Sequence, residues 1–213
     1  MSSALLKFDP YQWFVVAILA ILQFTLILDF MVLSPLGAQL LEELDITTAQ
    51  FGLVVSAYAF SAGASGILAA GFADRFDRKT LLLFFYAGFI LGTFLCGIAP
   101  TYFLLLMARI VTGIFGGVIG SIVFAIITDL FPLEMRGRVM GFVQMAFAVS
   151  QVLGLPVGLY FANLFDWHAP FLLIVVLSIP IYILIFLRLK PINAHLALQK
   201  DNSAFRHLWE TIS

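Results

Sequence analysis

The sequence has few charged residues and almost no cysteine. Asp, Glu, Lys and Arg make up 11% of its 213 residues, whereas about a quarter of an ordinary soluble domain is charged. A further 62% of the residues are hydrophobic, which is more apolar area than a folded chain of this size can hide from water. This balance excludes a soluble enzyme and a disordered chain, and the single cysteine, Cys96, excludes an internal disulfide scaffold. The composition therefore indicates an integral membrane protein.

Long apolar segments make up most of the chain. A helix needs about 20 mostly apolar residues to cross a bilayer. Six such segments lie at about 12–36, 50–73, 80–99, 102–130, 139–165 and 170–189. Because these runs are continuous and do not alternate between polar and apolar residues, they are not strands of a membrane barrel. The sequence predicts an all-α membrane protein with a six-helix transmembrane bundle in residues 1–189, followed by a cytoplasmic linker or tail at 190–213.

The basic residues are distributed unevenly between the two sides of the predicted bundle. Ten of the eleven Lys and Arg residues lie in the N-terminal tail, in the connections before the third and fifth spans, and in the C-terminal tail. The first, third and fifth connections have none. Since cytoplasmic loops carry an excess of Lys and Arg, we expect both termini on the cytoplasmic side of a cytoplasmic (inner) membrane.

Two charged residues, Asp29 and Arg109, fall inside predicted spans. Asp29 lies seven residues before Leu36 near the outer end of span one, and Arg109 lies eight residues after Thr101 at the start of span four. At 1.5 Å per residue, both lie roughly 10–12 Å below the outer ends of their helices, so they can meet across the bundle. A charge at membrane depth is costly unless it is paired or hydrated. We weigh three interpretations: a structural ion pair, a carboxylate whose protonation changes during the working cycle, and an Asp29 that reaches the outer water.

Span five carries a second set of polar residues. Gln144, Gln151 and Gly158 are spaced by seven, so on a straight helix they share one face. A glutamine in hydrocarbon needs a polar partner. We therefore expect this face to make a hydrogen bond to a neighbouring helix or to line a water-filled cavity.

Small residues recur at four-residue spacing in span four. Gly113 and Gly117 form one such pair, and Gly116 and Gly120 form another. In a membrane this spacing allows two helix backbones to approach closely. We expect these glycines to mark helix–helix contacts.

The connection between the second and third spans carries the most distinctive motif. Residues 71–79 read Gly-Phe-Ala-Asp-Arg-Phe-Asp-Arg-Lys, which resembles the signature loop of the major facilitator superfamily. Asp77 stands where that pattern has its second glycine. The resemblance extends over about residues 10–190 and implies the N-terminal six-span half of such a transporter. It also implies a cytoplasmic gate in which an acid at the end of span four joins the charges of the loop. The matching residues are Gly71, Asp74, Arg75, Arg78, Lys79 and Asp129.

Two further motifs indicate a branch of this superfamily. Leu105, Arg109 and Gly113 are similar to the span-four motif of its proton-coupled members, with Thr112 where a glutamine is usual. The second motif, Gly154-Leu-Pro156-Val-Gly158, resembles the span-five motif of antiporters, although its proline comes one place later. The resemblance is therefore to the drug:proton antiporter branch, with Asp29 and Arg109 in proton coupling.

These observations predict a secondary active transporter and not an enzyme. We expect proton-coupled efflux of a small organic solute by alternating access, driven by the proton gradient with no cofactor and no metal. The implied partners are the solute, protons, membrane lipid and a C-terminal half or second copy of the chain, because family members have two six-span halves; no nucleic-acid partner is expected. Two alternatives stay open: a proton-coupled uptake symporter, and a non-transporting half used for assembly or binding.

Overall fold

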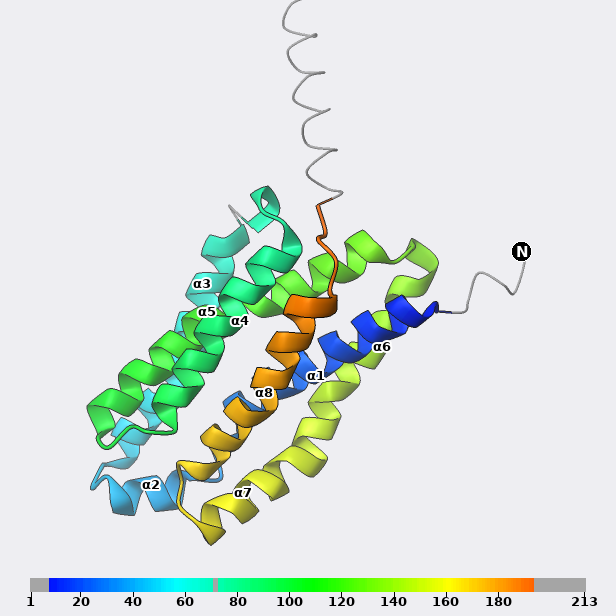
Figure 1. The fold of residues 1–213 in the computed structure, drawn as a ribbon. Helices are drawn as coiled ribbons and strands as arrows, with labels where there is room; N and C mark the ends of the chain where they lie inside the picture. Colours follow the sequence, from blue (N-terminus) through cyan, green and yellow to red (C-terminus); the bar gives the residue numbers. More distant parts are fainter. Residues whose placement is uncertain (1–7, 71–72, 194–213) are drawn as a thin grey trace, which may run out of the picture.

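The computed structural model describes residues 8–70 and 73–193, apart from the side chains of residues 70 and 74. Over this part of the chain it is helical between short turns and contains no strand (Figure 1). The elements are α1 (Pro10–Val32), α2 (Gly37–Glu43), α3 (Thr48–Ala70), η2 (Ala73–Arg75), α4 (Arg78–Cys96), α5 (Tyr102–Leu130), α6 (Leu133–Val149), η3 (Ser150–Gly154), α7 (Leu155–Leu164) and α8 (Ala169–Arg188).

The structure has six helices long and apolar enough to cross a membrane, which confirms the predicted number of spans. They are α1, α3, α4, α5, the continuous rod of α6, η3 and α7, and α8. The rod begins at Leu133, six residues before the start expected from hydropathy at 139. Hydropathy detects residues at lipid depth, whereas the helix continues into the polar stretch beyond it. Of the expected tail at 190–213, only residues 190–193 are among the described residues.

Polar caps explain where three of the spanning helices begin. Asp9 and Gln12 form a capping box at the start of α1, in which each side chain accepts a hydrogen bond from the other residue's backbone N–H. Asp77 caps α4 in a similar way, and Thr101 accepts from the backbone N–H of Leu104 at the start of α5. These caps satisfy N–H groups that a helix cannot satisfy internally.

The connection between the first two spans differs from the expectation. The apolar run was expected to continue as one helix to Leu36, but α1 ends at Val32 and the short helix α2 follows. Pro35 cannot donate a backbone hydrogen bond, so the regular helix ends before it. Figure 1 shows α2 lying across the end of the bundle where α7 ends.

Span four is the centre of one side of the bundle. In Figure 1, α5 lies between α3 and α4, while α1 packs against α6 and α8. The glycines of α5 allow the first of these contacts, because a Cβ atom at Gly117 would lie 2.5 Å from the Cα of Ala62 in α3. On the other side, a Cβ at Gly92 of α4 would lie 2.6 Å from the Oγ1 of Thr112. The expected role of the span-four glycines therefore holds for Gly113, Gly116 and Gly117, whereas Gly120 has no heavy atom within 4 Å of such a Cβ.

The Gly117→Ala variant is expected to lose stability. Its new methyl group would meet the Ala62 backbone, and overpacking of this kind costs about 1–3 kcal/mol. Gly120→Ala is the matched control, because the same change there meets open space and replaces a flexible residue in a helix, which stabilises by about 0.5–1 kcal/mol. Thermal unfolding in detergent micelles measures both. Equal melting temperatures for the two variants would contradict the close α3–α5 contact.

Candidate functional site

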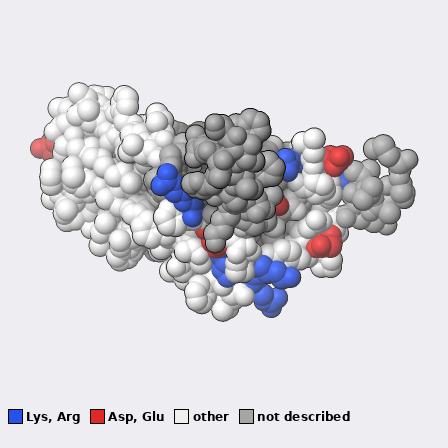
Figure 2. All heavy atoms as spheres, turned by 90° about the horizontal axis from the view of Figure 1, so that it is seen from above, with Lys and Arg blue, Asp and Glu red and all other residues white. Residues whose placement is uncertain are grey.

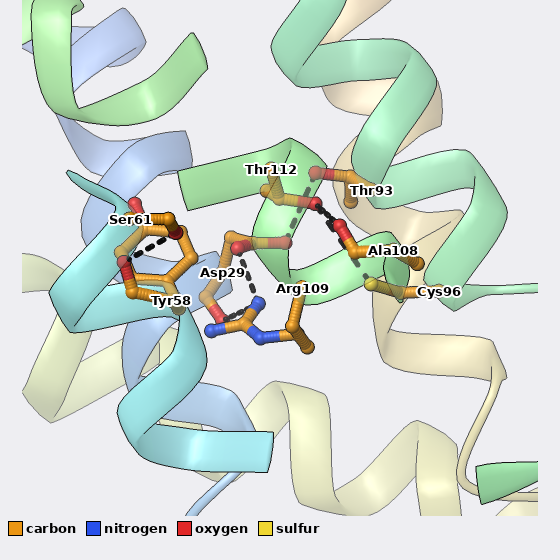
Figure 3. A network of polar contacts seen from close by, with 8 residues as sticks. All are labelled: Asp29, Tyr58, Ser61, Thr93, Cys96, Ala108, Arg109 and Thr112. Carbon is orange, nitrogen blue, oxygen red and sulfur yellow. Dashed lines mark hydrogen bonds and ion pairs between the residues drawn. The ribbon is translucent and has the colours of Figure 1, made fainter. Parts of the chain in front are cut away.

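The structure brings Asp29 of α1 and Arg109 of α5 together inside the bundle (Figure 3). The Nη1 of Arg109 lies 2.7 Å from the Oδ2 of Asp29, and neither side chain is exposed. The same Nη1 also donates to the backbone carbonyl of Asp29 at 3.3 Å. The two residues therefore meet at one depth, as the residue counts along spans one and four predict. The pair leaves no solvent contact for Asp29, so the interpretation that it reaches the outer water is wrong.

Hydroxyl groups of α4 and α5 surround the ion pair. The Oγ1 of Thr93 donates to the other carboxylate oxygen of Asp29 at 3.0 Å, so both oxygens accept a hydrogen bond. Thr112, which stands where a glutamine is usual in the resembling motif, donates to the carbonyl of Ala108 in its own helix. The thiol of Cys96 lies 3.9 Å from the Thr112 hydroxyl. Three helices thus hold the carboxylate and guanidinium in one place.

Tyr58 of α3 covers the guanidinium. The Cζ of Arg109 lies 4.4 Å from the centre of the Tyr58 ring, within the range of a cation–π interaction. The Nε and Nη2 atoms of Arg109 have no hydrogen-bond partner among the described residues. The ring therefore supplies part of the stabilisation that these donors lack, about 2 kcal/mol for a desolvated pair. Sequence reasoning missed Tyr58, because nothing in the spacing of the aromatic residues distinguishes it from the others.

A cavity of about 350 Å³ adjoins this cluster. Helices α1, α3, α5 and α6 form its walls, and the lining includes Gln23, Phe30, Tyr58, Gly116 and Phe147. Its surface is mainly apolar, so it suits an apolar or amphipathic molecule. The cavity and the buried ion pair share one wall residue, Tyr58.

The three polar-face residues of span five differ in exposure. Gln144 and Gln151 are exposed and do not line this cavity, whereas Gly158 is buried. The reason is the π-helical segment η3, which holds an extra residue in its turn and so breaks the seven-residue register of a straight helix. Gly158 therefore does not share the exposed side of Gln144 and Gln151, and the expected lining of a cavity by the two glutamines stays a prediction.

In the antiporter-like motif, the two glycines pack against a neighbouring helix and the proline is exposed. Gly154 and Gly158 face α1, because a Cβ atom at either position would lie 2.8 Å from a side-chain carbon of Leu28 or Val32. Pro156 is exposed. The two glycines thus let the rod that contains η3 and α7 pack closely on the helix that carries Asp29.

An ion pair closes the end of the bundle where α4 begins and α5 ends. The Nε of Arg78 lies 3.1 Å from the Oδ2 of Asp129, and the Nη1 of Arg78 donates to the carbonyl of Ala73. Lys79 donates to the carbonyl of Phe186 in α8 at 2.9 Å, and Arg75 is exposed. Of the other residues expected in the gate, Gly71 lies outside the described residues, as does the side chain of Asp74.

Asp77, the departure from the signature motif, ties two segments together. Its Oδ2 accepts from the backbone N–H and the hydroxyl of Thr80, and its Oδ1 accepts from the backbone N–H of Ile192 at 2.6 Å. The carbonyl of Ile192 in turn accepts from the backbone N–H of Arg78. A glycine in this place would offer none of these side-chain bonds. Asp77 therefore both caps α4 and fixes the chain that leaves α8.

Comparisons with known proteins agree with this geometry. The family model described as the Major Facilitator Superfamily matches residues 19–212. The chain belongs to this family, whose members are transporters and not enzymes. It is 36% identical over 119 residues to Multidrug resistance protein 3 of Bacillus subtilis, which is 56% of this chain and 23% of that protein. It is also 36% identical over 138 residues to the vacuolar membrane amino acid uptake transporter fnx2 of Schizosaccharomyces pombe, which is 65% of this chain and 23% of that protein.

Solved structures show the same fold. The inward open xylose transporter XylE from E. coli superimposes with a TM-score of 0.76 at 16% identity, covering 92% of this chain and 52% of that one. The chain thus corresponds to half of the major facilitator fold, and it spans about a quarter of the length of the two relatives above.

Replacing Asp77 tests the bond between α4 and the segment after α8. Asp77→Ala removes the helix cap, which costs about 1 kcal/mol, together with the acceptor for Ile192. We expect a lower melting temperature and faster hydrogen–deuterium exchange at the amide of Ile192. Glu42→Ala is the control, since it removes an equal charge from an exposed side chain of α2. Unchanged exchange at Ile192 would contradict the role given to Asp77.

Proposed function

We propose that the chain is one half of a proton-coupled efflux transporter that exchanges protons for a small organic solute by alternating access. One observation carries this proposal: a carboxylate and a guanidinium, Asp29 and Arg109, form a buried ion pair between two spanning helices. Buried ionisable groups in a membrane are costly and commonly mark proton or ion pathways. A relative named as a multidrug resistance protein supports efflux in particular.

The ion pair has the properties that a proton switch needs. When Asp29 is ionised, the pair is neutral overall and remains in the dry interior. A proton on Asp29 removes that balance and leaves Arg109 as an unpaired buried charge, a state that costs several kcal/mol unless water or another group reaches it. Protonation therefore favours a different arrangement of α1 and α5. A solute with unequal affinity for the two arrangements is then coupled to proton movement.

The distribution of charge supports a cytoplasmic position for both termini. Figure 2 shows the molecule from the end where α1 begins and α8 ends, with Lys and Arg side chains around it. These side chains belong to the connections and ends of the helices, and Arg109 is the exception among the described residues. Cytoplasmic surfaces carry this excess of Lys and Arg. The Arg78–Asp129 pair then lies on the cytoplasmic side, where it holds α4 and α5 together in one of the two orientations of the transport cycle.

The working transporter requires a second half. The six helices correspond to half of the family fold, and the substrate site of such transporters lies between the halves. Large apolar side chains on α3, including Phe60 and Ile67, are 79% and 78% exposed, so they contact lipid or a partner. A C-terminal half or a second copy of the chain fits this requirement.

The Asp29→Asn variant is expected to lose proton coupling. The amide cannot take up and release a proton as the carboxylate does, so the proton movement that accompanies the solute should be lost. Arg109→Ala should have the same effect. Inside-out membrane vesicles that contain the chain together with its second half provide the measurement, with ethidium fluorescence for the solute and a pH-sensitive dye for protons. Glu43→Gln, at an exposed acid of α2, is the control. Unchanged proton-linked efflux in both variants would refute this mechanism.

The Asp129→Asn variant is expected to slow turnover without weakening solute binding. A hydrogen bond to a charged group contributes about 1.5–3 kcal/mol, so its loss shifts the equilibrium between orientations by about tenfold or more. Asp74→Asn should act in the same direction. Comparison of the maximal rate of ethidium transport with its half-saturating concentration separates the two effects. A selective loss of binding, with the maximal rate preserved, would argue against a gate.

Two other functions have distinct signatures. Uptake by symport is favoured by the relative named as an amino acid uptake transporter, and it would move protons and solute in the same direction. A non-transporting half would give no specific exchange even when its second half is present, which counterflow in liposomes that contain both can measure.

A further inference from the structure

Tyr58 lies between the cavity and the buried ion pair. It is almost fully buried, lines the cavity between α1, α3, α5 and α6, and also covers the guanidinium of Arg109. Phe30, a second cavity residue, lies with its ring 5.3 Å from that of Tyr58. Figure 3 shows Tyr58 beside the Asp29–Arg109 pair. Tyr58 thus contacts both the cavity and the guanidinium of the ion pair.

The neighbouring glycines fix where the Tyr58 ring lies. A Cβ atom at Gly116 would lie 2.9 Å from the Tyr58 hydroxyl oxygen, and one at Gly113 would lie 2.5 Å from the Tyr58 carbonyl oxygen. A larger residue at either position would displace the ring or the backbone that carries it. The sequence of α5 therefore makes room for this aromatic side chain against the arginine.

The contacts of the Arg109 guanidinium include the ring of Tyr58. Its Nη1 is bonded to Asp29, while its Nε and Nη2 have no hydrogen-bond partner among the described residues. The π face of Tyr58 is a further contact that the structure gives to the positive charge. If the ring moves, the two unpartnered donors are open to the cavity, and the contact that holds Arg109 against Asp29 changes with it.

We infer that Tyr58 is the positioning residue through which a solute in the cavity acts on the Asp29–Arg109 pair. An aromatic or other apolar solute in the cavity contacts the same ring that covers the guanidinium, so its presence is transmitted to the ion pair by one side chain. This inference rests on the proposed proton-coupled function. It assigns the coupling to the aromatic ring of Tyr58 and not to its hydroxyl group.

The experiment compares Tyr58→Phe with Tyr58→Leu in the vesicle assay, with ethidium as the probe. Tyr58→Phe keeps the ring and should keep the number of protons moved per ethidium. Tyr58→Leu removes the π face, and that number should fall by roughly fivefold or more, with a smaller change in the half-saturating ethidium concentration. Tyr160→Leu, at an exposed tyrosine of α7, is the matched control and should behave as the parent protein does.

A second pair of variants decides the matter if Tyr58→Leu does not reach the membrane. Gly116→Ala places a methyl group against the Tyr58 hydroxyl and should displace the ring, which lowers the proton-to-ethidium ratio. Adding Tyr58→Phe removes the hydroxyl that the methyl group meets, so the double variant should recover the ratio. Such a rescue reports on the position of the ring and would not arise from a general loss of packing.

The outcomes separate this inference from the proposed function. A parent protein that moves no protons with ethidium would overturn both. If the parent is coupled and Asp29→Asn is not, but Tyr58→Leu keeps the parent ratio, the inference about Tyr58 is wrong and the proposed function stands. The inference about Tyr58 would also be wrong if Tyr58→Phe and Tyr58→Leu lost coupling equally. It would be wrong as well if Tyr58→Phe did not rescue Gly116→Ala.

Discussion

The ion pair between Asp29 and Arg109 is the constraint on which the rest of the bundle depends. Two charges in a dry interior are tolerated only when they lie close together and when other groups satisfy the atoms that the pair leaves over. Thr93, Tyr58 and the backbone of α1 provide these contacts. Each comes from a different spanning helix, so the position of one charged pair fixes how α1, α3, α4 and α5 approach one another.

Two of the polar clusters lie apart, one in the bundle interior and one at the end where α4 begins. In the interior, the ion pair, the hydroxyls and the adjoining cavity are in contact, which is the arrangement needed for a group that responds to both a proton and a solute. At the end of the bundle, Arg78 of α4 forms an ion pair with Asp129 of α5. Asp77 accepts a hydrogen bond from the segment that follows α8. The proposed coupling site and the proposed gate would therefore lie apart from each other in the bundle.

Several features could be predicted from the sequence because they follow from composition and simple geometry. The number of spans follows from apolar length, and the meeting of Asp29 with Arg109 follows from the rise per residue in antiparallel helices. The common face of Gln144, Gln151 and Gly158 could not be predicted in this way. The π-helical turn at Ser150–Gly154 changes the register that the spacing of residues assumes.

The sequence by itself determined the class of the protein, its six spanning helices and the two charged residues that must find partners. Only the tertiary structure decided that Tyr58 covers the arginine, that Asp77 binds the chain after α8, and which glycines make room for a neighbour. The physical reason is that hydropathy and helical rise are properties of a single segment, and the cost of a buried charge is a property of a single residue. Contacts between residues distant in the chain depend on how the helices rotate and pack, and no local pattern specifies that rotation.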